Sequence, residues 1–110
     1  MKENEKILTI EDLEKIIQGR KAEMPEGSYT ASLFKAGTDR IAQKVGEEGV
    51  EVAIAATRLG ITGSGEQNLI GEVADLWFHS LALLAQLDLP FIKIRQELTK
   101  RNIEKNFERR

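Results

Sequence analysis

The stretch KVGEEGVEVAIAA, residues 44–56, places three glutamates directly before an apolar, alanine-rich run. On a helix, with roughly 100° between residues, Glu48 and Glu51 fall on the apolar face or at its border, and Glu47 lies further round. Burying an unpaired carboxylate costs several kcal/mol, and like charges three residues apart repel each other. Lys44 offsets only part of this cost, so the stretch predicts a packed helix that needs more positive charge beside its acids.

A second pair of acids lies in IGEVADLWFHSLALL, residues 70–84, where Glu72 and Asp75 stand three residues apart among core positions. Two antiparallel helices that each present such a pair would bring their carboxylates together, which is how helix bundles build metal sites. All-oxygen ligands suit Mg²⁺ or Mn²⁺ better than zinc, and Mg²⁺ commonly binds substrate phosphates. The alternative is that both pairs face solvent, as a lone ExxE on a helix usually does. The spacing alone leaves both interpretations open.

Composition narrows the class of protein. The chain has 110 residues and is expected to form a single domain, residues 1–110. Charged residues make up 31% and aromatic residues 5%, which favours a helical, water-soluble protein, and a net charge of -2 lacks the basic footprint of a nucleic-acid binder. Cysteine is absent, which excludes disulfides and thiolate metal sites and fits a cytoplasmic location. No run has the length and apolar character of a signal peptide or a membrane span.

The apolar periodicity predicts a first helix that begins near Thr9. Asp12 follows at a spacing close to that of a capping box, and the helix fades before a turn at residues 24–28. Residues 28–36 are ambiguous, because serine and threonine compete locally for backbone hydrogen bonds. This segment is expected to be either a short helix or an ordered loop.

Two longer helices are predicted next. One begins at Thr38 or Asp39, both good N-caps, and runs to about residue 59 with Gly60 as its C-cap. The other begins near residue 64 or 65, where Ser64 and Gln67 fit a capping box, and runs to about residue 87. A short loop joins them, so they are expected to pack as antiparallel neighbours.

A fourth helix is expected after these, with Pro90 in its first turn. The stretch from Lys93 onward is rich in lysine and arginine, so we expect it to fray. Residues 103–110 are predicted to form a flexible tail of the single domain.

The third predicted helix is hydrophobic nearly all round, because Ile70, Trp77 and Leu81 lie outside its acidic face. A helix of this kind must be covered on every side, and four short helices in one chain do not supply enough cover. The predicted fold is therefore an all-α, antiparallel helix bundle completed by dimerisation. The protein is expected to be a homodimer or a larger homo-oligomer.

Two longer strings resemble a known family. They are GSYTASLFKAGTDRIAQKVGEEGVEVAIAA, residues 27–56, and GEVADLWFHSLALLA, residues 71–85. Together they are similar to the phosphoribosyl-ATP pyrophosphohydrolases of histidine biosynthesis, which belong to the MazG-like all-α nucleotide pyrophosphohydrolases. The resemblance covers about residues 13–102. The superfamily hallmark, EExxE followed by ExxD, is present as residues 47–51 and 72–75. The SYTASL, KAG and DRIAQKVGEE strings are more specific and resemble the phosphoribosyl-ATP pyrophosphohydrolases within that superfamily.

The resemblance implies a phosphoribosyl-ATP diphosphatase, a hydrolase that converts phosphoribosyl-ATP to phosphoribosyl-AMP and pyrophosphate with Mg²⁺. A second hypothesis is a housecleaning enzyme of the same superfamily that acts on NTPs or dNTPs. The SYTASL and KAG strings favour the first hypothesis over the second. A third hypothesis is a non-enzymatic helical dimerisation module whose acids face solvent. The expected partners are a nucleotide substrate and a second copy of the chain, with no nucleic acid and no membrane.

The resemblance also implies roles for the acids. Glu48, Glu51, Glu72 and Asp75 would be the Mg²⁺ ligands. Glu47 would be a further ligand, or it would orient and deprotonate the attacking water. The cation would neutralise charge on the triphosphate and lower the pKa of a bound water.

Five further residues are candidate substrate contacts, each with a structural alternative. The basic ones would bind phosphate, but they could instead be surface charges or, in one case, an ion pair that holds the acids apart. The hydroxyl-bearing ones would bind ribose or phosphate, but they could instead serve turns and helix caps. These candidates are Lys35, Arg40, Lys44, Ser28 and Tyr29.

His79, the only histidine, lies one turn beyond Asp75 on the same face. The first interpretation is a hydrogen bond from the His79 ring to a carboxylate that holds the metal. A histidine satisfied within the core is the close alternative, and direct metal ligation is the least favoured.

Overall fold

The structure, a computed structural model, describes residues 6–109. Residues 1–5 and 110, parts of the predicted domain and its tail, lie outside the described residues. Within the described range the elements are all helices, in agreement with the predicted all-α class. They are α1 (Ile10–Glu23), α2 (Tyr29–Ala36), α3 (Thr38–Thr62), α4 (Glu66–Gln86), α5 (Ile92–Ile103) and a 3-10 helix (Asn106–Arg109).

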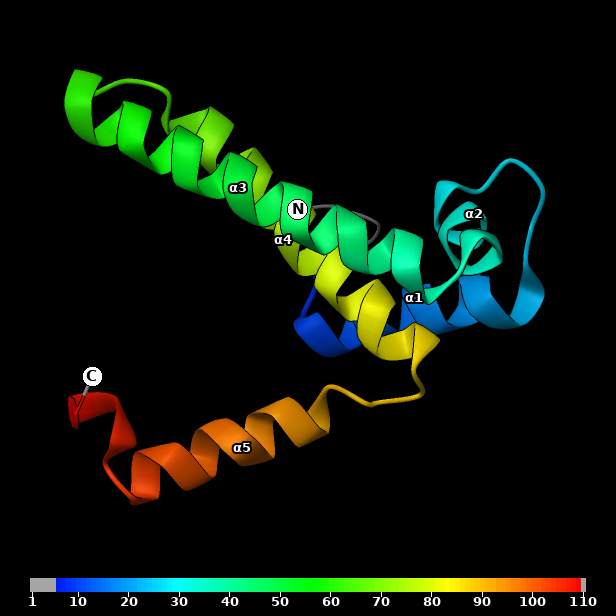
Figure 1. Cartoon of the computed structure of the whole chain (residues 1–110). Helices are drawn as coiled ribbons and strands as arrows, with labels where there is room; N and C mark the ends of the chain where they lie inside the picture. The colour runs from blue at the N-terminus through cyan, green and yellow to red at the C-terminus, as the bar shows by residue number, and fades with distance from the viewer. Residues whose placement is uncertain (1–5, 110) are drawn as a thin grey trace.

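Helices α3 and α4 form an antiparallel hairpin, as predicted (Figure 1). Helix α1 packs on α4, and α2 contacts α1, α3 and α4 at the same end of the hairpin. The core lies where these four helices meet, and Ile17 of α1 and Ile41 of α3 are fully buried there beside Leu81 of α4. Each such side chain stabilises the fold by about 1.5–3 kcal/mol. The outer half of the hairpin projects beyond this core.

Two helix starts have the serine or threonine caps that the sequence suggests. The Thr9 hydroxyl accepts from the Asp12 backbone N–H at 3.0 Å, and the Asp12 carboxylate accepts from the Thr9 N–H at 3.0 Å, which completes a capping box before α1. The Ser28 hydroxyl accepts from the Ala31 N–H at 3.1 Å. The ambiguous segment is therefore a helix, α2, with Ser28 as its N-cap.

The other predicted caps are wrong, because glycines take these positions. Gly37, not Thr38 or Asp39, precedes α3, and its φ of 98° is a backbone conformation that side chains oppose. Helix α3 continues past Gly60 and ends at Thr62, and its C-cap is Gly63, which has the left-handed φ of 72° typical of that position.

Helix α4 also begins without the predicted capping box. Gly65 is its N-cap at φ 97°, and no side chain bonds the first turn. The Ser64 backbone N–H instead donates to the Thr62 hydroxyl at 3.1 Å, so these two residues close the α3–α4 loop. Gln67 lies within the first turn of the helix.

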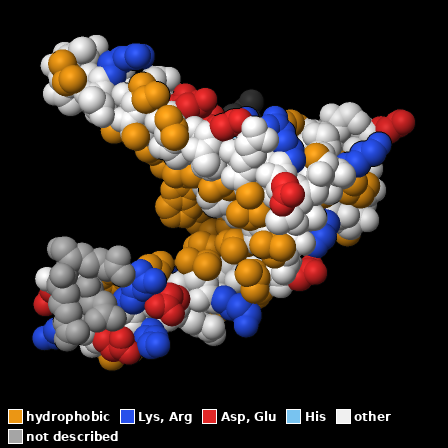
Figure 2. All heavy atoms as spheres, in the orientation of Figure 1, with side chains coloured by type: hydrophobic (Ala, Val, Ile, Leu, Met, Phe, Trp, Pro, Cys, Tyr) orange, Lys and Arg blue, Asp and Glu red, His pale blue; other side chains and the backbone are white. Residues whose placement is uncertain are grey.

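Helix α5 leaves the body of the molecule and runs apart from the α3–α4 hairpin (Figure 1). Helix α5 begins at Ile92, so Pro90 precedes the helix. The prediction that Pro90 lies in its first turn is therefore wrong. The stretch expected to fray from Lys93 is helical as far as Ile103. Figure 2 shows hydrophobic side chains gathered around the hollow between the hairpin and α5. Within residues 6–109, no helix combines the length and apolar character that crossing a membrane would need.

Candidate active site

Three of the predicted ligands come together where α3 and α4 face each other. Glu48 and Glu51 lie one turn apart on α3, and Glu72 lies on α4. One carboxylate oxygen from each lies within 4.8 Å of the others. Glu48 is only 5% exposed, Glu72 is half-buried and Glu51 is exposed, so the cluster opens to solvent on one side.

The cluster lacks enough hydrogen-bond donors for its charge. Glu48 Oε2 and Glu72 Oε2 are buried and have no hydrogen-bond partner among residues 6–109. The Glu72 carboxylate, by hydrogen bonding and by its charge, raises the pKa of Glu51 above its ordinary value. Converging carboxylate oxygens with unfilled lone pairs are the donor set that a hard divalent cation takes. The residues present therefore fit a site for Mg²⁺ or Mn²⁺.

Lys44 stands between two acids of α3. Its ammonium is 3.5 Å from Glu48 Oε1 and 3.6 Å from Glu47 Oε2. Burial lowers the pKa of Lys44, but Tyr29, Glu48 and Glu47 outweigh burial and raise this pKa overall. The structure therefore agrees with the interpretation of Lys44 as an ion-pair partner of the acids.

Glu47 lies outside the cluster. Besides Lys44, its carboxylate accepts from Gln43 Nε2 at 3.2 Å and stands 4.0 Å from Arg40 Nη1. Glu47 is therefore surrounded by donors, in contrast to Glu48 beside it. Glu47 and the buried Glu48 share Lys44 as a partner.

Asp75 does not join the other three acids. It follows Glu72 by three residues, which places it about 60° round α4, and its side chain is exposed. The prediction that four carboxylates converge is confirmed for three of them and not for Asp75. Its role as a ligand stays a prediction.

His79 is 5% exposed and has two partners, but neither is a carboxylate. Nδ1 lies 2.7 Å from the main-chain carbonyl of Asp75, and Nε2 lies 2.8 Å from the Tyr29 hydroxyl. The expected hydrogen bond to a ligand carboxylate is therefore wrong for this structure, and the alternative of a satisfied core histidine holds.

Two more predicted contacts lie at opposite ends of α2, Ser28 at its N-cap and Lys35 in its last turn. The Ser28 hydroxyl is engaged in its helix cap, as the structural alternative expected. Ser28 and the exposed Lys35 line one pocket of about 230 Å³. No contact in the described residues joins this pocket to the carboxylate cluster, so a shared substrate site stays a prediction.

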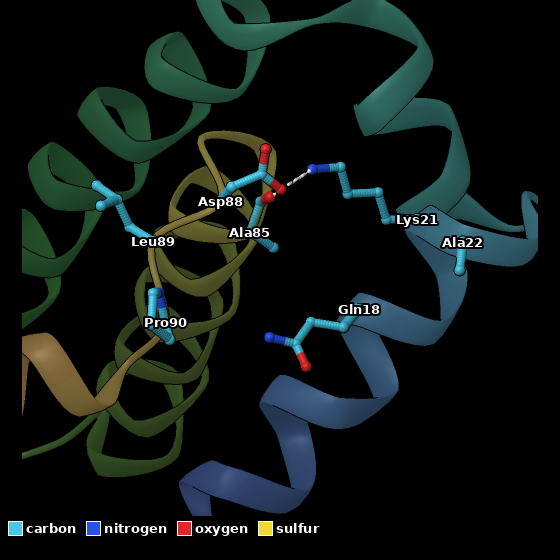
Figure 3. A pocket seen from close by; sticks show the side chains of 7 residues that line it. All are labelled: Gln18, Lys21, Ala22, Ala85, Asp88, Leu89 and Pro90. Carbon is cyan, nitrogen blue, oxygen red and sulfur yellow. Dashed lines mark hydrogen bonds and ion pairs between the residues drawn. The ribbon is translucent and has the colours of Figure 1, made fainter.

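The larger cavity of about 500 Å³ lies elsewhere, at the junction of α1 with the end of α4 (Figure 3). There the Lys21 ammonium donates to the Ala85 carbonyl at 2.7 Å and to Asp88 Oδ1 at 2.8 Å. On the same helix, Glu14 accepts from the Phe91 N–H at 2.6 Å, just before α5. The sequence did not single out Lys21 or Glu14, because their partners lie more than 60 positions away.

Comparison with known proteins identifies relatives over most of the chain. The family described as Phosphoribosyl-ATP pyrophosphohydrolase matches residues 10–102. A phosphoribosyl-ATP pyrophosphatase of Hydrogenovibrio crunogenus is 49% identical over 81% of this chain and 78% of its own length. A protein of the same name from Methanocella arvoryzae is 40% identical over 84% of this chain and 94% of its own length.

A longer relative matches as well. The histidine biosynthesis bifunctional protein HisIE of Campylobacter jejuni is 50% identical over 82% of this chain, which corresponds to 41% of that protein. The family match includes every carboxylate of the cluster and both longer strings that suggested the resemblance. The chain belongs to the phosphoribosyl-ATP pyrophosphohydrolase family.

Proposed function

We propose that this chain is a phosphoribosyl-ATP diphosphatase, which hydrolyses phosphoribosyl-ATP to phosphoribosyl-AMP and pyrophosphate in histidine biosynthesis. The family match and the relatives named phosphoribosyl-ATP pyrophosphatase support the substrate. The observation that carries the proposal is the cluster of Glu48, Glu51 and Glu72, with its two buried, unpartnered oxygens. A cytoplasmic location is part of the same proposal.

Mg²⁺ is the proposed cofactor, and Mn²⁺ would suit the same ligands. Glu48, Glu51 and Glu72 would hold the cation, with Asp75 proposed as a fourth ligand. When bound, the cation would supply positive charge against the triphosphate and lower the pKa of a water. The two oxygens without partners support this assignment, because such atoms destabilise the fold unless something else compensates them.

The neighbouring side chains would do the rest of the chemistry. Glu47 would orient and deprotonate the attacking water, since Gln43 and Lys44 hold its carboxylate next to Glu48. Hydrolysis at the α–β linkage then releases pyrophosphate as one unit. Most of the rate enhancement would come from positioning and electrostatic stabilisation. The substrate contacts in this proposal are Lys35, Arg40, Lys44, Ser28 and Tyr29.

A homodimer completes the proposal. Large apolar side chains are exposed on the outer hairpin, among them Ile61 at 79% and Ile70 at 51%, and Leu98 of α5 is 45% exposed. Helix α4 contains three acids and no lysine or arginine, whereas α5 contains four basic residues and one glutamate. Opposite charges and unburied apolar faces in one chain support a second copy as the occupant of the hollow in Figure 2.

Sedimentation of the wild type and of Leu98→Glu tests the dimer. The wild type should sediment as a dimer or larger, and the variant should shift toward monomer, because it places a charge within the apolar face of α5. Lys100→Glu, which changes a charge on the same helix, should weaken the dimer less. A monomeric wild type at micromolar concentration would exclude this part of the proposal.

The function is tested by incubating the purified protein with phosphoribosyl-ATP, with and without Mg²⁺, and measuring pyrophosphate. ATP and dNTPs serve as competing substrates, and Glu48→Ala serves as the site variant. Release that needs Mg²⁺, prefers phosphoribosyl-ATP and disappears in Glu48→Ala supports the proposal. Preference for dNTPs would assign the chain to nucleotide housecleaning instead, and no release from any substrate would leave only a helical dimerisation module.

A further inference from the structure

The Tyr29–His79 contact connects α2 with α4. Tyr29 begins α2, and His79 lies in α4 one turn after Asp75. The distance from the Tyr29 hydroxyl to His79 Nε2 is 2.8 Å, and the two rings meet edge to face with centroids 5.8 Å apart. Phe78 packs against the His79 ring at 5.2 Å. The imidazole is therefore held on several sides, while the Tyr29 side chain stays about half exposed.

The partner of Nδ1 decides the direction of the hydrogen bonds. A main-chain carbonyl only accepts, so Nδ1, 2.7 Å from the Asp75 oxygen, must bear the proton. In the neutral ring Nε2 is then an acceptor, and the Tyr29 hydroxyl must donate to it. The phenol proton is thus used inside the protein. The Tyr29 oxygen can therefore accept a hydrogen bond from a ribose hydroxyl or an ammonium. It has no proton left to donate to a phosphate oxygen.

The Tyr29 side chain also interacts electrostatically with Lys44. Burial has the largest effect on the pKa of Lys44 and lowers it, whereas Tyr29 is one of the groups that raise this pKa. The Lys44 ammonium in turn stands 3.5 Å from Glu48 Oε1. Hydrogen bonds therefore connect the Asp75 carbonyl through His79 to Tyr29, and Tyr29 interacts electrostatically with Lys44, which pairs with Glu48.

We propose that His79, one turn after Asp75 on α4, is a positioning residue that fixes the Tyr29 hydroxyl as a hydrogen-bond acceptor, and that this hydroxyl receives a ribose hydroxyl of the nucleotide. This inference rests on the proposed function for the identity of the ligand. The geometry of the two hydrogen bonds does not depend on it. His79 contacts no ligand itself, and it acts through Tyr29.

Nitrogen NMR of the imidazole tests the geometry without any substrate. His79 is the only histidine in the chain, so its two ring nitrogens give unambiguous signals. The wild type should show the proton on Nδ1, and Tyr29→Phe should shift the Nε2 resonance while the proton stays on Nδ1. A proton on Nε2 in the wild type would overturn the proposal.

Two isosteric variants separate positioning from general support of the fold. In His79→Asn the amide can still donate to the Asp75 carbonyl but cannot reach Tyr29. In His79→Gln the amide oxygen can still accept from Tyr29 but the donor to Asp75 is lost. We expect His79→Asn to lower kcat/KM for phosphoribosyl-ATP about tenfold, as for loss of one hydrogen bond, mainly through a higher KM. His79→Gln should lose less than His79→Asn.

The double variant Tyr29→Phe/His79→Asn completes the test. If His79 acts through Tyr29, the double variant should be no more impaired than Tyr29→Phe alone. Losses that multiply, or equal losses in His79→Asn and His79→Gln, would overturn the positioning role. If the wild type releases no pyrophosphate, the proposed function fails, and the NMR result still decides whether His79 orients Tyr29.

Discussion

Helix α1 and the facing carboxylates of α3 and α4 differ in how their charges are compensated. On α1, Asp12 completes a capping box, Glu14 accepts from the Phe91 N–H, and Lys21 bonds the end of α4. Between α3 and α4, Glu48 and Glu72 each keep a buried oxygen without a partner. Both regions are rich in charge, but only α1 uses its charges to hold helices together.

This difference separates structural charge from charge available for chemistry. A satisfied polar group stabilises the fold modestly, whereas a buried unsatisfied one costs about 1–3 kcal/mol, so natural proteins keep the latter mainly at functional sites. Cavity size would have placed the functional site at α1 instead, because the cavity of about 500 Å³ lies beside Lys21 (Figure 3). The unpartnered oxygens, and not the cavity, identify the candidate site.

The strongest test of the comparison is Glu48→Gln. We expect pyrophosphate release to fall by about a hundredfold or more, because the variant removes a charged ligand from the cluster. Without metal, the free energy of unfolding should stay the same or rise, because a buried unpartnered oxygen loses its charge. Steady-state assays and urea unfolding in EDTA measure the two effects. A large loss of stability in EDTA would show that Glu48 is a structural charge like those of α1.

Metal binding gives the next largest effect. Mg²⁺ at 100 times its Kd should raise the free energy of unfolding of the wild type by about 2.7 kcal/mol. Thermal unfolding with increasing Mg²⁺ measures this, and Glu48→Gln should lose most of the response. Glu47→Gln is the matched control: it changes the adjacent acid outside the cluster, so it should keep the metal response while losing activity. Equal responses in all three proteins would show that the cluster is not the metal site.

The sequence predicted much of the fold, because helix identity follows from apolar periodicity. The order of the helices, the α3–α4 hairpin and the Thr9 capping box are confirmed. Helix ends were less predictable where two glycines lie within one turn of each other. Gly60 and Gly63 both fit a C-cap by type, and only the backbone shows which takes the left-handed conformation.

The site was predictable to a similar degree. Spacing placed all four acids on facing sides of two helices, but only three of them converge, and the exposed Asp75 lies outside the cluster. The His79 partners were not predictable, because one is a main-chain carbonyl and the other comes from α2, some 50 positions away. Long-range contacts of this kind leave no periodic signal.

Lys21→Met sharpens the comparison from the side of α1. The variant keeps much of the packing but loses one charged donor to the Ala85 carbonyl, which keeps the Asp88 N–H, so we expect the free energy of unfolding to fall by about 1 kcal/mol. Pyrophosphate release should stay within about twofold of the wild type, because Lys21 contacts none of the clustered acids. Asp88→Asn is the control: that side chain is 89% exposed, so it should change stability by less than about 0.5 kcal/mol. A loss of activity without a loss of stability in Lys21→Met would contradict the division between the two regions.

The smallest expected effect concerns Asp12 and its dependence on pH. Hydrogen bonds from the Thr9 backbone and side chain hold the pKa of Asp12 below its ordinary value of 3.8. A carboxyl whose pKa is lower in the folded state contributes stability above its unfolded pKa, and that contribution is lost as the pH falls through the folded pKa. The wild type should therefore exceed Asp12→Asn in stability at neutral pH, and the difference should shrink below about pH 4. Urea unfolding of both proteins between pH 3 and pH 7 measures this difference in stability. A difference that does not change with pH would mean that Asp12 acts through its shape alone, and not through the charge that the comparison with α1 assigns to it.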